Sequence, residues 1–292
     1  MSYGKHQSFY IKKGWITKGI RAVLENPNVF FSRDGFLELG IGRNMQQSLK
    51  FWLETCNILG RTANRTHELT PFGELINQYD LGGNKNLTKN LVHYFITYEN
   101  IENNNENIQI IDKDDYASTF SWFFSKYRER FIDKGHAQSK IVEFTEGKVS
   151  ENTLSRDIEC LINMYSRYES DNPEDKNVSF LGDLGLIRKN SDDIFVRVRI
   201  KESKISLHAM YFILLINQHG GHLSLSNIIN AENNIGKCFN LNRTEILSVI
   251  DKMISIGLDL SITRTAGLDT VRIAETDPFV FLRRAYESGE NI

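Results

Sequence analysis

The sequence is poor in the residues that interrupt helices, with only four prolines and 20 glycines in 292 residues, so long helices are permitted. It also lacks an excess of one charge, since 35 lysines and arginines face 37 aspartates and glutamates. Bulk charge therefore does not indicate a nucleic-acid partner, and any such role depends on where the charges lie. Hydrophobic residues at 40% and aromatic residues at 11% exclude a disordered chain and predict buried cores.

Cysteines and long apolar runs are scarce as well. Cys56, Cys160 and Cys238 are odd in number and far apart, and each lies in an apolar stretch, which predicts reduced core thiols. The longest apolar run, residues 209–216, is shorter than the roughly 18–20 residues that a membrane helix needs. No apolar stretch follows the N-terminal residues, so we expect no signal peptide. These absences predict a cytoplasmic protein without membrane contact, metal or other cofactor.

Motifs of the common enzyme classes are missing. The sequence has no Walker loop, no Gly-x-Ser-x-Gly elbow and no His-Glu-x-x-His pair. Gly40-Ile41-Gly42 lacks the third glycine of a dinucleotide fingerprint and follows a predicted helix, which favours a turn between helices. Asp112, Asp114 and Asp115 lack the lysine and carboxylate pattern of a two-metal nuclease and are more typical of a solvated loop. We therefore predict a protein without catalytic activity.

The first 80 residues have the order of a winged helix-turn-helix. Apolar positions at helical spacing predict three helices, and the glycine turn precedes the third, which Asn44 is placed to cap. The polar, basic run at residues 61–66 and the strand that follows predict a hairpin with a basic tip. Three helices followed by such a hairpin are typical of this DNA-binding motif.

Weaker copies of the pattern occur at residues 139–199 and 207–273. In the last copy, Asn242 is placed to cap a helix, and residues 257–262 and 270–273 can form a hairpin. We predict a mainly α fold of tandem winged helix-turn-helix-like modules with small β-hairpin wings. The predicted divisions are an N-terminal winged helix at 1–82, a central helical region with a possible second module at 83–202, and a C-terminal module at 203–292.

Polar side chains on the third predicted helix suit the reading of DNA. Those expected at its exposed start are Arg43, Asn44, Gln46, Gln47 and Lys50. Arginine can form two hydrogen bonds with guanine, and asparagine or glutamine two with adenine, in the major groove. The hairpin adds Arg61 and Arg65 for phosphate or the minor groove. Residues 14–75 hold seven basic and six acidic side chains, so the prediction depends on residue type and position.

Several segments together resemble a known family, the domain of unknown function 4007. They are residues 6–19, 39–45, 51–53, 69–73, 122–124, 154–161 and 265–269. The resemblance covers most of the chain. It implies a bacterial protein encoded beside sulfurtransferases related to phosphoadenosine-phosphosulfate reductases, in phage-defence islands that include DNA phosphorothioation systems. It implies neither a reaction nor a catalytic residue.

Residues and resemblance together lead to one expected function and one alternative. We expect a non-catalytic protein that binds double-stranded DNA through the third helix and the hairpin. The alternative is an adaptor that uses the same face to dock a sulfurtransferase or another defence protein, because many winged helices bind protein instead of DNA. The target sequence, a preference for sulfur-modified DNA and the oligomeric state stay open.

Overall fold

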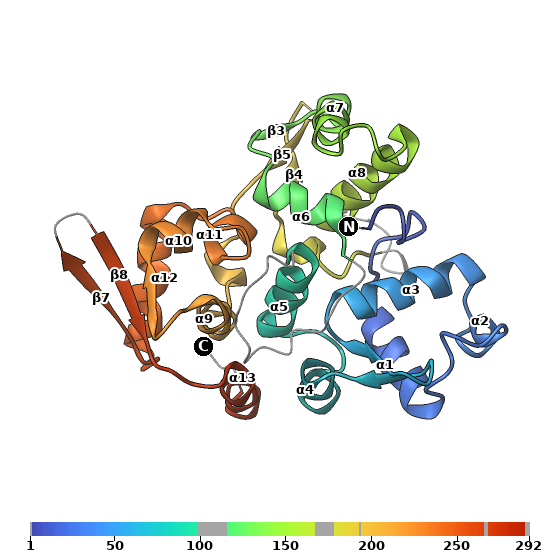
Figure 1. The fold of residues 1–292 in the computed structure, drawn as a ribbon, viewed down its shortest axis with the longest axis horizontal. Coiled ribbons are helices and arrows are strands. Elements are labelled where there is room, and N and C mark those ends of the chain that lie inside the picture. Colours follow the sequence, from blue (N-terminus) through green and yellow to red (C-terminus); the bar gives the residue numbers. More distant parts are fainter. Residues whose placement is uncertain (1, 99–115, 167–177, 193, 266–267, 290–292) are drawn as a thin grey trace.

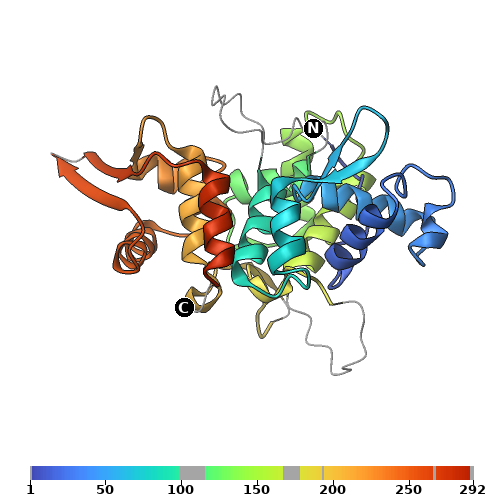
Figure 2. The same ribbon diagram turned by 90° about the horizontal axis from the view of Figure 1, so that it is seen from below.

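The computed structural model describes residues 2–98, 116–166, 178–192, 194–265 and 268–289. Within these residues the chain is mainly helical with small antiparallel sheets, as the sequence predicts. Asp112, Asp114 and Asp115 lie outside the described residues. The described helices include none that is long and apolar enough to cross a membrane. The β7–β8 hairpin projects at one end of the molecule and α2 lies at the other (Figures 1 and 2).

The N-terminal part contains helices and one hairpin in the predicted order. Its elements are α1 (Trp15–Glu25), α2 (Gly35–Glu38), α3 (Arg43–Thr55), β1 (Leu59–Arg61), β2 (His67–Leu69) and α4 (Pro71–Tyr79). Gly40 has a φ of 59°, which lets the chain turn from α2 into α3. Thr70 caps the N-terminus of α4, because its hydroxyl accepts a hydrogen bond from Gly73 N at 3.0 Å. The backbone N–H of His67 donates to Pro27 O at 2.8 Å, so the segment before α2 borders the hairpin.

The central part surrounds a three-stranded sheet. Its elements are α5 (Asn86–Thr97), α6 (Ser118–Ser125), β3 (Phe131–Ile132), α7 (Lys134–Phe144), α8 (Glu151–Tyr165), the 3₁₀ turn η1 (Gly182–Leu184), β4 (Ile187–Lys189) and β5 (Phe195–Arg197). The strand order is β3-β5-β4, with both pairs antiparallel. Trp122, Phe123 and Phe124 of α6 are buried, so they form core and not a stacking surface for the bases of a single strand.

The C-terminal part repeats that arrangement. Its elements are η2 (Glu202–Lys204), α9 (Leu207–Asn217), β6 (His222–Ser224), α10 (Leu225–Asn230), α11 (Ile235–Cys238), α12 (Arg243–Ser255), β7 (Leu260–Thr265), β8 (Leu268–Ile273) and α13 (Pro278–Glu287). The strand order is β6-β8-β7. Asn242 caps α12 as predicted, and Glu245 returns a hydrogen bond to its backbone N–H at 2.9 Å. In both parts, therefore, the strand that precedes the helices pairs with the last strand of the hairpin that follows them: β3 pairs with β5, and β6 pairs with β8.

Helix α5 lies near the centre of the molecule and connects the parts (Figure 1). It packs against α6, α9 and α11, with His93 fully buried at the meeting point. His93 Nδ1 lies 2.8 Å from the Tyr165 hydroxyl, and Nε2 lies 2.8 Å from Cys238 O. Burial lowers the pKa of His93 to about 4, so the ring is neutral at physiological pH. Helix α13 returns to stack Tyr286 on Tyr79 of α4, with ring centroids 6.1 Å apart.

The three cysteines are free and buried, as predicted. Cys56 and Cys160 lie in the common hydrophobic core, and Cys238 lies beside Thr97 of α5. Burial raises the pKa of Cys238 to about 12. A protonated thiol of this kind is a small core side chain, not a nucleophile.

Candidate nucleic-acid interface

The N-terminal half of α3 presents polar side chains to solvent. Leu49 and Trp52 anchor the opposite face of the helix in the core, because apolar residues at that spacing lie on one side. Arg43, Asn44 and Gln47 are exposed, as predicted. Asn44 does not cap the helix, however, because α3 already begins at Arg43 after Gly42. The Asn44 amide therefore lies in the first helical turn, on the solvent side.

Gln46 was predicted to lie beside these residues, but that expectation is wrong. Its side chain is buried and its amide nitrogen donates to Val29 O at 3.0 Å. A β-carbon at Gly35 would lie 1.8 Å from Val29 O and 2.8 Å from Gln46 Nε2, so glycine is required there. Gln46 thus holds the segment between α1 and α2 against α3, and its side chain is not available to contact bases in the major groove of DNA.

Lys50 is half-buried, whereas the sequence predicted an exposed side chain. Its ammonium group lies 3.8 Å from the centroid of the Phe31 ring, a cation–π contact. Phe31 in turn stacks on His67 of β2, with centroids 4.7 Å apart. Lys50 therefore helps to join α3 to the hairpin through Phe31, and its side chain is only partly accessible to an external partner.

Arg61 is held by a carboxylate that the sequence analysis did not identify. Its guanidinium forms two hydrogen bonds with Glu54 of α3, from Nε and Nη2, each of 2.7 Å. His67 Nε2 lies 2.7 Å from the same carboxylate. The Arg61 side chain remains 45% exposed, but its charge is matched. Arg61 thus joins the hairpin to the C-terminal end of α3, about 16 Å along the helix axis from Arg43.

Arg65 lies at the tip of the hairpin and is exposed. Its φ of 58° is in the left-handed region, where the chain reverses direction. Thr62 and Thr66 close the turn on either side through hydroxyl oxygens 2.6 Å apart. Unlike Arg61, Arg65 has no ion pair with any described acidic residue, so its charge can reach an external anion.

Acid is expected to weaken the junction between α3 and the hairpin. Burial raises the pKa of Glu54, but hydrogen bonds from Arg61 and His67 outweigh it and lower that pKa below its ordinary 4.5. The stabilisation is therefore complete above pH 4.5 and is lost as the pH falls through the lowered folded value. Urea unfolding between about pH 7 and 3 should show this loss in the wild type and not in Glu54→Gln. Glu68→Gln, at an exposed position of β2, should keep the wild-type pH dependence. Parallel pH profiles for wild type and Glu54→Gln would contradict the assignment.

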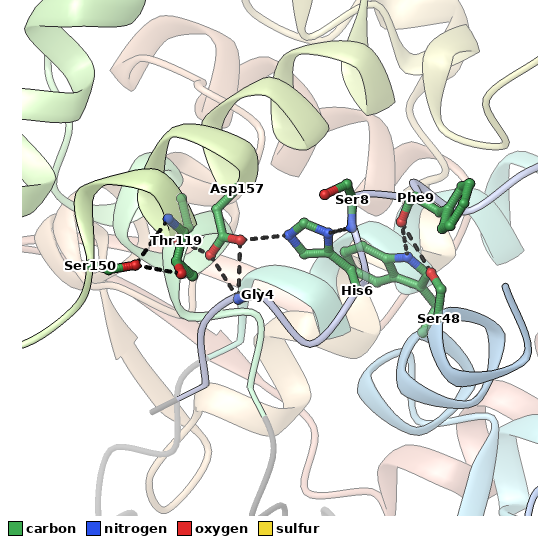
Figure 3. A network of polar contacts seen from close by, with 10 residues as sticks. Gly4, His6, Ser8, Phe9, Ser48, Thr119, Ser150 and Asp157 are labelled. Atoms are coloured by element: carbon green, nitrogen blue, oxygen red, sulfur yellow. Dashed lines mark hydrogen bonds and ion pairs between the residues drawn. The ribbon is translucent and has the colours of Figure 1, made fainter. Parts of the chain in front are cut away.

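The N-terminal segment is held in place by a buried hydrogen-bond network, and no local sequence pattern predicts it. Asp157 of α8 accepts hydrogen bonds from Gly4 N at 3.1 Å, His6 Nε2 at 2.8 Å and the Thr119 hydroxyl at 2.8 Å (Figure 3). Asp157 is 2% exposed and His6 is 3% exposed. The donors come from residues 38 to 153 positions away in the sequence.

His6 has a structural role within this network. Ser8 N donates to His6 Nδ1 at 3.1 Å, so the ring proton is on Nε2, the nitrogen that donates to Asp157. Both ring nitrogens are therefore occupied, and the pair is closed to solvent. The following residues reach α3, because Trp52 Nε1 donates to Phe9 O at 2.8 Å. The segment thus connects α8 with α3, as Figure 3 shows.

Within the part of the chain that the structure describes, no three histidine, cysteine, aspartate or glutamate side chains come together to hold a metal ion. His219 and His222, which have metal-compatible spacing in the sequence, pair through their backbones in a turn. Two acidic residues near the candidate interface, Glu54 and Glu38, form hydrogen bonds with Arg61 and Asn26.

Comparison with known proteins gives a family and a fold. The family described as Protein of unknown function (DUF4007) matches residues 3–286. Among solved structures, a crystal structure of a protein named SspB has a TM-score of 0.80 at 16% identity, and a magnesium ion-bound SspB has 0.83 at 17%. Each match covers 99% of this chain and 90% of the other. No curated protein matches. At this identity the SspB structures establish a shared fold alone, whereas the family match spans nearly the whole chain, which therefore belongs to the DUF4007 family.

Proposed function

We propose that this protein binds double-stranded DNA without catalysis, as a component of a bacterial phage-defence or DNA phosphorothioation system. The observation that carries the proposal is the exposed N-terminal half of α3, where Arg43, Asn44 and Gln47 face solvent together. These side chain types can each form two hydrogen bonds with a base edge in the major groove. The defence context comes from the family resemblance and is part of the proposal.

The arrangement of elements supports a winged helix-turn-helix in the N-terminal part. Helices α1, α2 and α3 are followed directly by the β1–β2 hairpin, and α3 is then the recognition helix. The central and C-terminal parts support further modules of this type. In the central part, α6 and β3 are followed by α7, α8 and the β4–β5 hairpin, and β3 pairs with β5. In the C-terminal part, α9 and β6 are followed by α10, α11, α12 and the β7–β8 hairpin, and β6 pairs with β8.

Different residues of the interface would serve different functions. Arg43 suits guanine, and Asn44 and Gln47 suit adenine. Arg65 at the hairpin tip suits phosphate or a minor groove. Lys50 and Arg61 are partly exposed and can add phosphate contacts, although each also joins α3 to the hairpin.

The double variant Arg43→Ala with Arg65→Ala is expected to bind a short DNA duplex more weakly by about 1–3 kcal/mol. It removes one base contact and one phosphate contact, so the dependence of affinity on salt should also decrease by about one ion. Fluorescence anisotropy at two or more salt concentrations measures both quantities. The matched control, Lys140→Ala with Arg283→Ala, removes two exposed cations from α7 and α13 and should bind as the wild type does. Equal affinities of the double variant and the wild type would show that the exposed face of α3 and the hairpin tip do not bind DNA.

The same titration with a phosphorothioated duplex tests whether sulfur is recognised. Since one SspB structure is described as magnesium ion-bound, plasmid DNA should also be incubated with magnesium or manganese. We expect intact plasmid. Nicked or linear product that depends on the metal would contradict the non-catalytic part of the proposal.

The adaptor function is the second candidate, favoured by exposed apolar side chains on the same N-terminal part. Leu24 of α1 is 57% exposed and Leu37 of α2 is 66% exposed. Such side chains suit a protein partner more than a phosphate backbone. An adaptor would show no salt-dependent DNA binding and would co-purify with a phosphoadenosine-phosphosulfate-reductase-like sulfurtransferase. Leu37→Ser would then abolish that co-purification.

A further inference from the structure

A large open cleft lies between the central sheet and α12, away from the α3 interface. It has a volume of about 1490 Å³. One side is formed by the α6–β3 connection and by β4 and β5, and the other by α12. Residues 198–203 and 205–208, from the segment that runs from β5 into α9, also line it. Figure 1 shows this connection descending from the central sheet toward the C-terminal helices.

Positive charge predominates in this cleft. Its basic lining residues are Arg128, Arg130, Arg188, Arg197, Arg199, Lys201 and Lys252. Its acidic lining residues are Glu129, Glu202 and Glu245. Two of these carboxylates are already paired, Glu245 with Arg199 and Glu202 with Lys252. Seven cations against three anions therefore leave an excess of four positive charges.

The unpaired cations come from separate segments that the fold gathers. Arg128 and Arg130 follow α6, Arg188 is in β4, and Lys201 follows β5. All four are exposed, and none forms an ion pair with a described acidic residue. Because these four side chains line the same cleft and have no ion-pair partner among the described residues, their positive charges repel one another, and binding of an external anion would reduce that repulsion.

Arg197 adds a buried charge beneath the cleft. Its guanidinium donates to Phe124 O at 3.0 Å and to the carbonyl oxygens of Phe123 and Tyr127, at the end of α6. Its Nε atom is buried without a hydrogen-bond partner. Burial and the nearby charge of Arg128 lower the pKa of Arg197 to about 10, so it is still protonated at neutral pH. This fixed cation strengthens the field inside the cleft.

The shape and lining of the cleft favour an extended polyanion over a small ligand. Small-molecule sites have volumes of about 300–1,000 Å³ and are mostly apolar. The lining residues include no glycine, so the backbone cradle of a nucleotide-phosphate loop is missing. They also include no phenylalanine, tyrosine or tryptophan on which the bases of a single strand could stack. Arginine and lysine without stacking groups are typical of contacts with duplex phosphates.

We propose that this cleft binds the phosphate backbone of a nucleic-acid duplex, as a second contact site beside the α3 interface. The inference rests on the proposed function for the identity of the duplex as DNA. Helix α12 supports it by position, because it precedes the β7–β8 hairpin as α3 precedes β1–β2. Its N-cap Asn242 and its polar residues Ser248 and Lys252 line the cleft, so the C-terminal part meets the duplex through this helix.

The experiment compares a cleft variant, Arg128→Ala with Arg188→Ala and Lys201→Ala, with a charge-matched control. The control, Lys140→Ala with Arg283→Ala and Arg284→Ala, removes the same number of exposed cations outside the cleft. We expect the cleft variant to bind a short duplex at least about tenfold more weakly. Its salt slope should decrease by about two to three, because each lost phosphate contact removes about 0.9. Circular dichroism and thermal unfolding confirm that each variant is folded.

The outcomes separate this inference from the proposed function. Wild-type affinity of the cleft variant, with weakened binding by Arg43→Ala and Arg65→Ala, would overturn the cleft and leave the α3 interface in place. The reverse result would support the cleft and overturn the α3 interface. Loss of single-stranded but not duplex binding, or competition by a mononucleotide at equal phosphate concentration, would overturn the choice of a duplex. No binding by the wild-type protein would overturn both.

Discussion

Replacing Asp157 with alanine is expected to lower the free energy of unfolding by about 3–5 kcal/mol. The carboxylate is 2% exposed and accepts hydrogen bonds from Gly4 N, His6 Nε2 and the Thr119 hydroxyl (Figure 3). Alanine leaves two buried donors, His6 Nε2 and the Thr119 hydroxyl, without this acceptor, and the partly buried Gly4 N loses it as well. Urea unfolding of wild type and variant measures the difference.

The effect should be concentrated in the N-terminal segment. Residues 2–11 connect α8 to α3, so loss of Asp157 should increase hydrogen exchange there before the rest of the chain. Asp157→Asn should be less destabilising than alanine, because one oxygen still accepts while the amide nitrogen faces a donor. Asp251→Ala, at an exposed position of α12, is the matched control and should change stability by less than about 0.5 kcal/mol. A similar small change for Asp157→Ala would show that the network contributes little.

Replacing Arg197 with methionine is expected to lower the free energy of unfolding by about 3–4 kcal/mol. The guanidinium caps the C-terminal end of α6, where helical carbonyl oxygens have no partner within the helix. Its planar donors serve the carbonyls of Phe123, Phe124 and Tyr127 at once, and its face lies 5.5 Å from the Phe123 ring centroid. Methionine can fill the volume but donates nothing, so these oxygens lose their buried donor.

Two further variants separate charge from geometry at this position. Arg197→Lys keeps the charge but should recover only part of the stability, because one ammonium group cannot reproduce the planar fork. Arg199→Met removes an arginine two residues away whose side chain is 67% exposed, and its ion pair with Glu245 should contribute at most about 1 kcal/mol. If Arg197→Met were no more destabilising than Arg199→Met in urea unfolding, the capping role would be wrong.

Asp157 and Arg197 also support the proposed function indirectly, because each holds in place a segment beside a proposed DNA-binding surface. Asp157 holds the segment that reaches Trp52 of α3, and Arg197 connects the central sheet with α6 beside the cleft. Neither is proposed to contact DNA. We therefore expect their variants to lose stability more than intrinsic affinity, in contrast to the Arg43, Arg65 and cleft variants, which change exposed side chains.

The order of helices and hairpins followed from the sequence because each element depends on residues close together in the chain. Asn242 and Glu245 are three positions apart and form the cap that begins α12. The hairpin at residues 260–273 and the glycine turn before α3 are also local features. The family resemblance likewise depends on short segments read in order.

The surroundings of the functional side chains were decided by the tertiary structure. Helical periodicity places Gln46 near the solvent side of α3, yet Val29, 17 residues earlier, accepts its hydrogen bond and buries it. Arg61 has the sequence context of a free wing residue, but Glu54 on the adjacent helix pairs with it.

Long-range placement explains the features that sequence analysis missed. His6 and Asp157 are separated by 151 residues, and the cleft gathers Arg128, Arg188 and Lys201 from three segments of the central part. A repeat along one helix or strand reports only which residues share a face of that element. The sequence by itself thus determined the elements and the chemistry that they carry. Packing between elements decided which charges are paired inside the protein and which face outward.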